Sequence, residues 1–120
     1  MDLKKYNFTC PHCKQILNEG DEIELVTKRN HGDNGRIYLS VAFGNYTYKH
    51  IPDTDFQKGE LVEFHCPKCG SNLASKIYEN FASLNMQVDT NINFEVIFSR
   101  IAGERKTYVV TEDGIETYQG

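Results

Sequence analysis

Two short cysteine motifs constrain the fold of this chain more than any other feature of its sequence. The first, FTCPHCKQ, contains Cys10 and Cys13, and the second, FHCPKCGS, contains Cys66 and Cys69. All the cysteines of the chain therefore belong to two Cys-Pro-x-Cys units, each with a phenylalanine two residues before its first cysteine. Because proline fixes the backbone just after the first cysteine, each unit favours a tight turn that presents two thiolates to one cation.

Four thiolates from two such turns complete the closed tetrahedral shell of a structural zinc ion, with Zn–S bonds of about 2.3 Å. Tetrahedral four-cysteine sites also accept iron, and an iron–sulfur cluster takes four thiolates as well. The sequence thus predicts a metal site formed by Cys10, Cys13, Cys66 and Cys69. Zinc is the favoured ion, and iron or an iron–sulfur cluster is the alternative.

Two interpretations without a metal are less favoured. The N-terminal sequence lacks the apolar segment of a secretory signal, so the chain is expected in the cytoplasm, where thiols stay reduced and disulfides are rare. Cys-Pro-His-Cys resembles the active-site tetrapeptide of periplasmic disulfide oxidoreductases, whose cysteine pair begins a helix. Here Asn18, Gly20 and Asp21 follow Cys13 and indicate a turn into a strand. A redox dithiol would also leave the second cysteine pair without a role.

The stretches CPHC and CPKCG, each next to short predicted strands, resemble the paired knuckles of zinc ribbons and of the wider rubredoxin-like group. The resemblance covers about a quarter of the chain and implies that the four cysteines are the ligands of one metal ion. Gly70 matches the usual knuckle glycine, which tolerates a positive φ. Lys14 occupies the corresponding position of the first unit, which predicts a differently shaped first turn because a left-handed lysine costs roughly 1–2 kcal/mol.

The spacer between the two units is longer than in a compact ribbon. Between Cys13 and Cys66 lie 52 residues, against the usual spacing of about 15–20. Closing such a loop costs roughly 3.5 kcal/mol plus a constant, whereas structural zinc contributes about 10–16 kcal/mol in finger peptides. The spacer is therefore compatible with one shared metal ion.

Outside the knuckles, the chain is typical of an antiparallel β protein. Alternating apolar and polar residues predict strands at 22–26 and 92–100 and two strand pieces within 36–50, where a change of phase at Gly44 indicates a bulge or bend. An Asp-Gly pair at 113–114 predicts a hairpin in a three-stranded meander. The fold class is mainly β, with a zinc-ribbon-like four-cysteine site joined to an antiparallel sheet or meander.

We predict a single domain over residues 1–120. It comprises knuckles at 8–15 and 64–71, an inserted β region at 16–63 and a C-terminal β meander at 89–119. Residues 72–88 fit both a helical and a strand periodicity, and we predict one short helix near 73–82 followed by a strand. No repeat is visible beyond the cysteine units.

Charge and motif content narrow the functional classes. The net charge is −4 without a run of one sign, which argues against nucleic-acid binding because phosphate neutralisation supplies most of that affinity. No uncharged stretch is long enough to span a bilayer, so no membrane contact is expected. No phosphate loop, nucleophile elbow or metalloprotease motif occurs. We expect a protein-binding accessory module rather than an enzyme, with nucleic acid as the less favoured partner.

The histidines are interpreted as non-ligands. His12 and His65 each adjoin a cysteine, but the four thiolates already complete a tetrahedral shell. His31 and His50 are expected to face solvent at loops or strand ends.

Two further clusters of side chains could take part in binding, but each also has a simpler structural interpretation. An aromatic group in the inserted region could stack on bases, although tyrosine is common in ordinary sheets and packing is the favoured interpretation; it comprises Tyr38, Tyr46 and Tyr48. A positive cluster surrounds the IAGE turn, but acidic neighbours make a solvated hairpin end the favoured interpretation; it comprises Arg100, Arg105 and Lys106.

Overall fold

The computed structural model describes residues 6–29, 32, 34–53 and 56–119, and in these residues all regular structure is β. One sheet has the strand order β1-β7-β8-β9-β10. Its strands are β1 (Asn7–Thr9), β7 (Phe81–Asp89), β8 (Ile92–Ser99), β9 (Lys106–Thr111) and β10 (Gly114–Gln119). The second sheet has the order β2-β3-β4-β5, with β6 also paired to β3. Its strands are β2 (Asn18–Glu19), β3 (Glu22–Arg29), β4 (Asn34–Ser40), β5 (Tyr48–Ile51) and β6 (Val62–His65).

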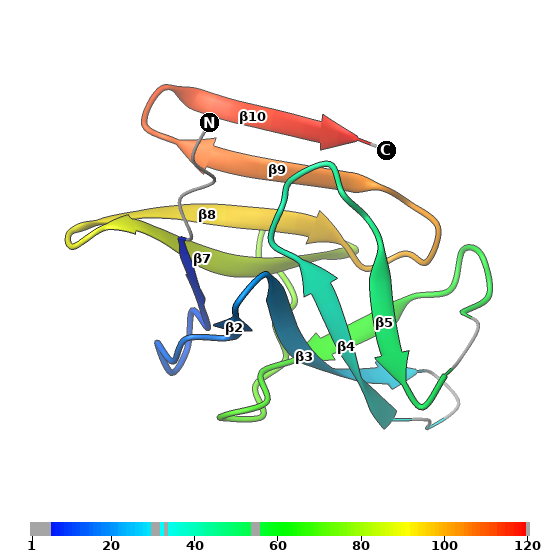
Figure 1. The fold of residues 1–120 in the computed structure, drawn as a ribbon. Coiled ribbons are helices and arrows are strands. Elements are labelled where there is room, and N and C mark those ends of the chain that lie inside the picture. The colour runs from blue at the N-terminus through cyan, green and yellow to red at the C-terminus, as the bar shows by residue number, and fades with distance from the viewer. Residues whose placement is uncertain (1–5, 30–31, 33, 54–55, 120) are drawn as a thin grey trace.

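The strands of the two sheets cross at a steep angle (Figure 1), which is one of the two common ways for sheets to pack. Side chains from both inner faces form one buried cluster, which includes Phe8, Leu25, Phe64, Leu84 and Val96. The predicted mainly β, antiparallel fold is confirmed. The C-terminal meander is confirmed as well, because β9 pairs antiparallel with both β8 and β10.

The short helix predicted near 73–82 is wrong. Residues 73–80 contain turns and isolated bridges, and β7 begins at Phe81. The backbone N–H of Leu73 donates to the carbonyl of Phe64 at 2.8 Å, which holds this segment along β6. Ile77, which the helical pattern places on a buried face, is 76 % exposed, whereas Ala82 and Leu84 on the strand pattern are buried. Pairing with neighbouring strands therefore overrides the local helical spacing.

The change of phase at Gly44 marks a reversal of the chain, not a bend within one strand. β4 ends at Ser40, and β5 returns antiparallel to it from Tyr48. Gly44 lies in the connecting loop with a φ of 87°, a left-handed value that favours glycine. The alternation changes phase because the residues before and after Gly44 belong to two different strands.

The fold is built from two copies of one arrangement, which the sequence does not reveal beyond the cysteine units. In each copy, a knuckle is followed by three antiparallel strands: β3–β4–β5 in the first and β7–β8–β9 in the second. An offset of 59 residues, as from Glu22 to Phe81, superposes the strand registers of the two units. The equivalent register pairs include Glu22–Ser40 with Phe81–Ser99, and Leu39–Tyr48 with Phe98–Thr107.

The loops after the second strand repeat in the same way. The hydroxyl of Ser40 accepts a hydrogen bond from the N–H of Ala42 at 3.1 Å, and that of Ser99 accepts one from Ile101 at 3.0 Å. Few residues are identical at equivalent positions. Those outside the knuckles are Leu17 and Leu73, Leu25 and Leu84, Asn34 and Asn93, Ser40 and Ser99, and Gly44 and Gly103.

The two copies exchange their leading strands. β1, which precedes the first knuckle, pairs with β7 of the second copy, and β6, which precedes the second knuckle, pairs with β3 of the first. The registers are again equivalent, because Phe8 lies opposite Met86 as Phe64 lies opposite Thr27. Each knuckle is therefore the point at which the chain crosses from one sheet to the other.

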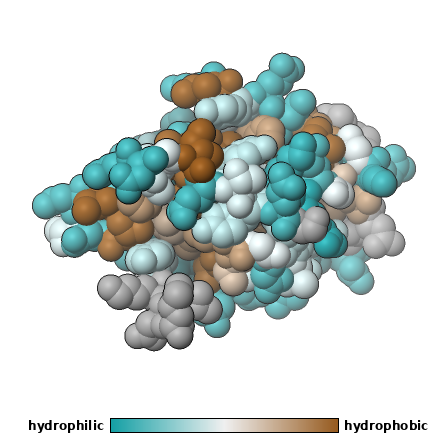
Figure 2. Space-filling model, turned by 90° about the horizontal axis from the view of Figure 1, so that it is seen from above, coloured by the Kyte–Doolittle hydropathy of each residue, from teal (hydrophilic) through white to brown (hydrophobic). Residues whose placement is uncertain are grey.

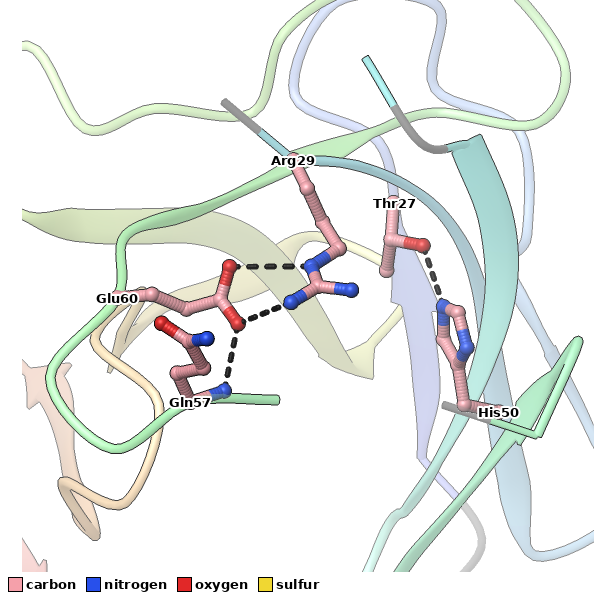
Figure 3. Close-up of polar contacts among 5 residues, drawn as sticks. All are labelled: Thr27, Arg29, His50, Gln57 and Glu60. Atoms are coloured by element: carbon pink, nitrogen blue, oxygen red, sulfur yellow. Dashed lines mark hydrogen bonds and ion pairs between the residues drawn. The ribbon is translucent and has the colours of Figure 1, made fainter. Parts of the chain in front are cut away.

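A buried polar network lies beside β3 and β5 (Figure 3). Nε2 of His50 lies 2.6 Å from the hydroxyl of Thr27, and its Nδ1 lies 2.7 Å from the carbonyl oxygen of Pro52. His50 is only 9 % exposed, so the expectation that it faces solvent is wrong. Thr27 and Pro52 satisfy both ring nitrogens, which makes burial of the imidazole acceptable. His31 lies outside the described residues.

Within the described part of the chain, no helix has both the length and the apolar character that crossing a membrane requires.

Candidate metal centre

The four cysteines lie together where the two chain crossings meet. Sγ of Cys10 is 3.8 Å from Sγ of Cys69, and Sγ of Cys13 is 3.7 Å from Sγ of Cys66. The four sulfur atoms all lie within 4.8 Å of one another. A tetrahedron with Zn–S bonds of about 2.3 Å has an edge of about 3.8 Å, so these two separations match a metal-bound geometry. The cluster can hold a metal ion after a small contraction of the wider pairs.

The two knuckles have the same backbone hydrogen bonds. The N–H groups of Lys14 and Gly70 donate to the carbonyls of the cysteines four residues earlier, both at 2.9 Å. The N–H groups of His12 and Lys68 approach the sulfur of the first cysteine in their own knuckle, both at 3.3 Å. Backbone N–H groups aimed at sulfur favour the thiolate form, which is the form that binds a metal ion.

Lys14 adopts the knuckle conformation in spite of its side chain. Its φ is 65°, against 77° for the equivalent Gly70, so the prediction of a differently shaped first turn is wrong. The left-handed conformation costs a non-glycine residue roughly 1–2 kcal/mol. The hydrogen bonds of the turn impose it, and Nζ of Lys14 adds a bond of 2.8 Å to the carbonyl of Pro11.

Within each knuckle, the first cysteine is buried and the second lies nearer the surface. Cys10 and Cys66 are 0 % and 1 % exposed, whereas Cys13 is partly buried and Cys69 is exposed. Burial raises the pKa of the Cys10 thiol and raises the pKa of Cys66 to about 12. A cation at the centre of the cluster would favour both buried thiolates and displace their protons.

Cys69 shows the opposite effect. Hydrogen bonding to the hydroxyl of Ser71, 3.3 Å from its sulfur, and then to the Ser71 backbone lowers the pKa of Cys69 to about 6. The sequence analysis did not single out Ser71. The only signal for it is its place two residues after the last cysteine of a knuckle, where a hydroxyl can reach back to the sulfur.

The histidines next to the cysteines point elsewhere or are exposed. Nδ1 of His65 lies 3.0 Å from the carbonyl of Gly70, and its Nε2 lies 3.0 Å from the carboxylate of Glu63. Both ring nitrogens are therefore engaged away from the cluster. His12 is exposed on the tip of the first knuckle. Among the described residues, the group of side chains close enough to share a metal ion contains cysteines alone.

The alternatives without a metal find no support in the geometry. The four cysteines are free thiols, and the separations of 3.7 and 3.8 Å are far longer than a disulfide bond of about 2.05 Å. The chain after Cys13 enters β2 and β3 instead of a helix. The N-terminal helix position that lowers a cysteine pKa in disulfide oxidoreductases is thus missing from this part of the described chain.

The tyrosine group does not form one stacking surface. Tyr48 lies opposite Leu39 across the β4–β5 pair, so it shares a face with Leu39, and Tyr38 is on the other face. The hydroxyl of Tyr46 lies 3.0 Å from the hydroxyl of Thr107 and donates to the carbonyl of Tyr118 at 2.8 Å. Tyr46 therefore ties the β4–β5 loop to the other sheet.

Comparison with known proteins gives no relative from which a function could be transferred, because no protein-family model, curated protein or solved structure matches the chain.

Proposed function

We propose that the chain is a small zinc protein in which Cys10, Cys13, Cys66 and Cys69 hold one structural Zn²⁺. The observation that carries this proposal is the cluster of four sulfur atoms, with two separations at the length of a tetrahedral edge. Four thiolates leave no open coordination position, which is typical of structural rather than catalytic zinc. Such an ion stabilises the fold and does not take part in a reaction.

The position of the cluster explains what the metal would stabilise. Cys10 and Cys13 follow β1 of one sheet, and Cys66 and Cys69 follow β6 of the other. A single ion bound by both pairs would fix the two chain crossings to each other at one end of the sheets. The fold would then depend on the metal as small zinc domains generally do.

The test is elemental analysis of protein purified without added metal, followed by thermal unfolding with and without a strong chelator. We expect one zinc per chain, and with chelator a fall in the melting temperature of more than about 20 °C or loss of the cooperative transition. An unchanged melting curve after zinc has been removed would contradict a structural role.

Iron is the second candidate, because Cys69 is exposed and would give a redox-active ion an edge open to an electron partner. Rubredoxin-like electron transfer would then be the function. Visible absorption of protein purified without oxygen separates the two, since an iron–thiolate centre is coloured. A colourless protein with one zinc per chain contradicts the iron assignment.

We further propose that the protein acts in the cytoplasm as an accessory module that binds another protein. The support is a set of large apolar side chains that are more than half exposed, among them Ile51 on β5 and Ile115 on the edge strand β10. Figure 2, viewed from the β10 side, shows apolar groups standing apart among hydrophilic ones. A contiguous apolar patch marks a site of protein contact, whereas apolar residues exposed singly are normal on protein surfaces, so the variant experiment below decides this proposal.

The partner class is tested by exposing the zinc-loaded protein to cell extract. Ile115→Glu is the variant, and Ile92→Glu, at the first residue of β8, is the matched control. We expect a specific protein to be retained by the wild type and by the control but not by Ile115→Glu. Retention on single-stranded DNA that weakens with salt would favour nucleic acid instead. No catalytic role is proposed, since no catalytic constellation was recognised in the sequence.

A further inference from the structure

A cavity of about 460 Å³ lies between the two sheets, and none of the four cysteines lines it. Its volume falls in the range of about 300–1,000 Å³ that is usual for small-molecule sites. The two equivalent loops after β4 and β8, residues 40–46 and 99–105, both contribute to its wall. The cavity is thus formed where the two copies of the fold face each other.

The interior of the cavity is apolar and aromatic. Inner-face side chains of both sheets contribute to the lining, including Phe8, Ile37, Leu39, Phe64, Val96 and Phe98. Phe43 closes one side, because its ring stacks on Tyr118 at a centroid distance of 4.9 Å and meets Phe8 edge to face at 6.1 Å. Such a lining favours a ligand with an apolar body.

A buried ion pair fixes a further part of the wall. Arg29 donates two hydrogen bonds to the carboxylate of Glu60, at 2.7 and 3.0 Å, and Glu60 also accepts the N–H of Gln57 at 2.7 Å (Figure 3). The guanidinium of Arg29 lies 5.3 Å from the ring centre of Phe56, which lines the cavity. The contact with Arg29 therefore holds the Phe56 ring in place as an aromatic part of the cavity wall.

The charges on the lining have the opposite sign to the chain as a whole. Four cationic side chains and one carboxylate line the cavity, although the chain carries a net charge of −4: Lys58, Arg100, Arg105, Lys106 and Glu104. The carboxylate of Glu104 is engaged, because it accepts a hydrogen bond from the hydroxyl of Ser99 at 2.8 Å and lies 4.0 Å from Nζ of Lys106.

Of the four cations, Arg100 is partly buried and the other three are exposed. Nε of Arg100 is buried and has no hydrogen-bond partner among the described residues, which is unusual because buried polar atoms are nearly always hydrogen-bonded. Its backbone is fixed: the N–H donates to the carbonyl of Asn80, and the carbonyl accepts the N–H of Val62, both at 2.8 Å. The equivalent residue of the first copy is Val41, so the second copy introduces a charge at an apolar position.

We propose that this cavity binds a small amphipathic anion, with its apolar body between the sheets and its anionic head group on the guanidinium of Arg100. The pairing of an apolar chamber with a lining that includes the partly buried cation Arg100 matches such a ligand on both counts. The planar guanidinium is suited to carboxylate or phosphate, because it can donate two parallel hydrogen bonds. This site is separate from the cysteine cluster and does not depend on which metal the cluster holds.

The test is calorimetric titration of the full, metal-loaded chain with three probes of equal chain length: octanoate, octyl phosphate and octan-1-ol. At least one of the two anions should saturate a single site below about 5 mM, at least about tenfold more tightly than the alcohol, since a hydrogen bond to a charged group contributes that much. The tighter anion identifies the head group. Amide shifts in residues 40–46 and 99–107 should accompany binding.

Two variants locate the charge that the ligand uses. Arg100→Met should weaken binding of the anion at least about tenfold and leave the alcohol unchanged, whereas Lys28→Gln, an exposed cation of β3 outside the lining, should bind like the wild type. Equal affinity for anion and alcohol, no saturation by either anion, or an unchanged Arg100→Met would each overturn the proposal. Should Arg100→Met fail to fold, the comparison of probes on the wild type decides.

Discussion

The two copies of the fold have nearly the same backbone and very different side chains. Their strand registers agree at a constant offset, and their knuckles share the same hydrogen bonds. Outside the cysteine motifs, only five equivalent pairs of residues are identical across the described strands and loops, the leucine, asparagine, serine and glycine pairs named above. The backbone of each copy is therefore specified by turn chemistry and alternation, which many side-chain sets satisfy.

The places where the copies differ are equally informative. The second copy has three more residues between its knuckle and its hairpin, from Cys69 to Phe81 compared with Cys13 to Glu22. These extra residues form the exposed turn around Ile77 and leave the strand register unchanged. The difference in chain length lies in this turn, because a paired strand cannot gain residues without a change of register.

Separating the copies should have the largest effect. Fragments 1–60 and 61–120 each lack the leading strand that pairs with their own hairpin, because β1 and β6 are exchanged. We expect each fragment alone to show no cooperative unfolding transition by circular dichroism, and the mixture with zinc to recover β structure. If one fragment folded on its own, its hairpin would not need the leading strand from the other copy, which would contradict the interdependence of the two copies.

Replacing the equivalent candidate metal ligands should have the next largest effect. We expect Cys10→Ser and Cys66→Ser to lose the metal and to lower the free energy of unfolding by similar amounts, several kcal/mol each, because both are buried first cysteines of a knuckle. Zinc content and urea unfolding measure this. His12→Ala, at the exposed tip of the first knuckle, serves as the control and should change neither. Unequal losses would show that the two knuckles do not share one ion equally.

Equivalent core leucines allow a smaller test. Leu25 and Leu84 are 0 % and 1 % exposed and occupy the same position in β3 and β7. Each change to alanine should lower the free energy of unfolding by about 2–5 kcal/mol through lost burial and a cavity. Urea midpoints at fixed zinc concentration measure the effect, and Ile115→Ala at the exposed edge should stay within about 0.5 kcal/mol. A leucine whose removal is harmless would place its copy outside the shared core.

The smallest effects on stability are expected at the residue that follows the second cysteine of each knuckle, and they should have opposite signs in the two copies. Lys14→Gly should raise the free energy of unfolding by less than about 1 kcal/mol, because it relieves a left-handed lysine but adds flexibility to the unfolded chain and loses the bond to Pro11. Gly70→Ala should lower it by about 1 kcal/mol. Urea unfolding of both variants at the same zinc concentration compares the signs. Changes of the same sign would mean that the left-handed conformation does not cost a side chain the same free energy in the two turns.

The candidate site could be predicted almost entirely from the sequence. Cysteine, proline and a left-handed position act within a few residues, so the spacing of Cys10, Cys13, Cys66 and Cys69 already specifies turns that can present thiolates to one cation. The hairpins of the C-terminal meander were predictable for the same reason, since alternation and the Asp-Gly turn are local. The identity of the ion, the partner and the absence of catalysis stay predictions.

The helix predicted near 73–82 shows where local patterns stop being sufficient. Ile77 fits a helical stripe by spacing, yet the segment is held along β6 by residues far away in the sequence. His50 shows the same limit, because its burial depends on Thr27 from another strand. Neither outcome follows from the residues nearby.

The sequence by itself determined the two cysteine turns and the alternating strands, because both depend on chemistry between near neighbours. Only the tertiary structure decided that the chain is two copies with exchanged leading strands, since strand pairing joins residues such as Phe8 and Met86 that are distant in the chain. It also decided that a cavity lined in part by Arg100 lies between the sheets. The cavity is formed by side chains from both sheets, and the spacing of residues along the chain does not show which surfaces will face each other.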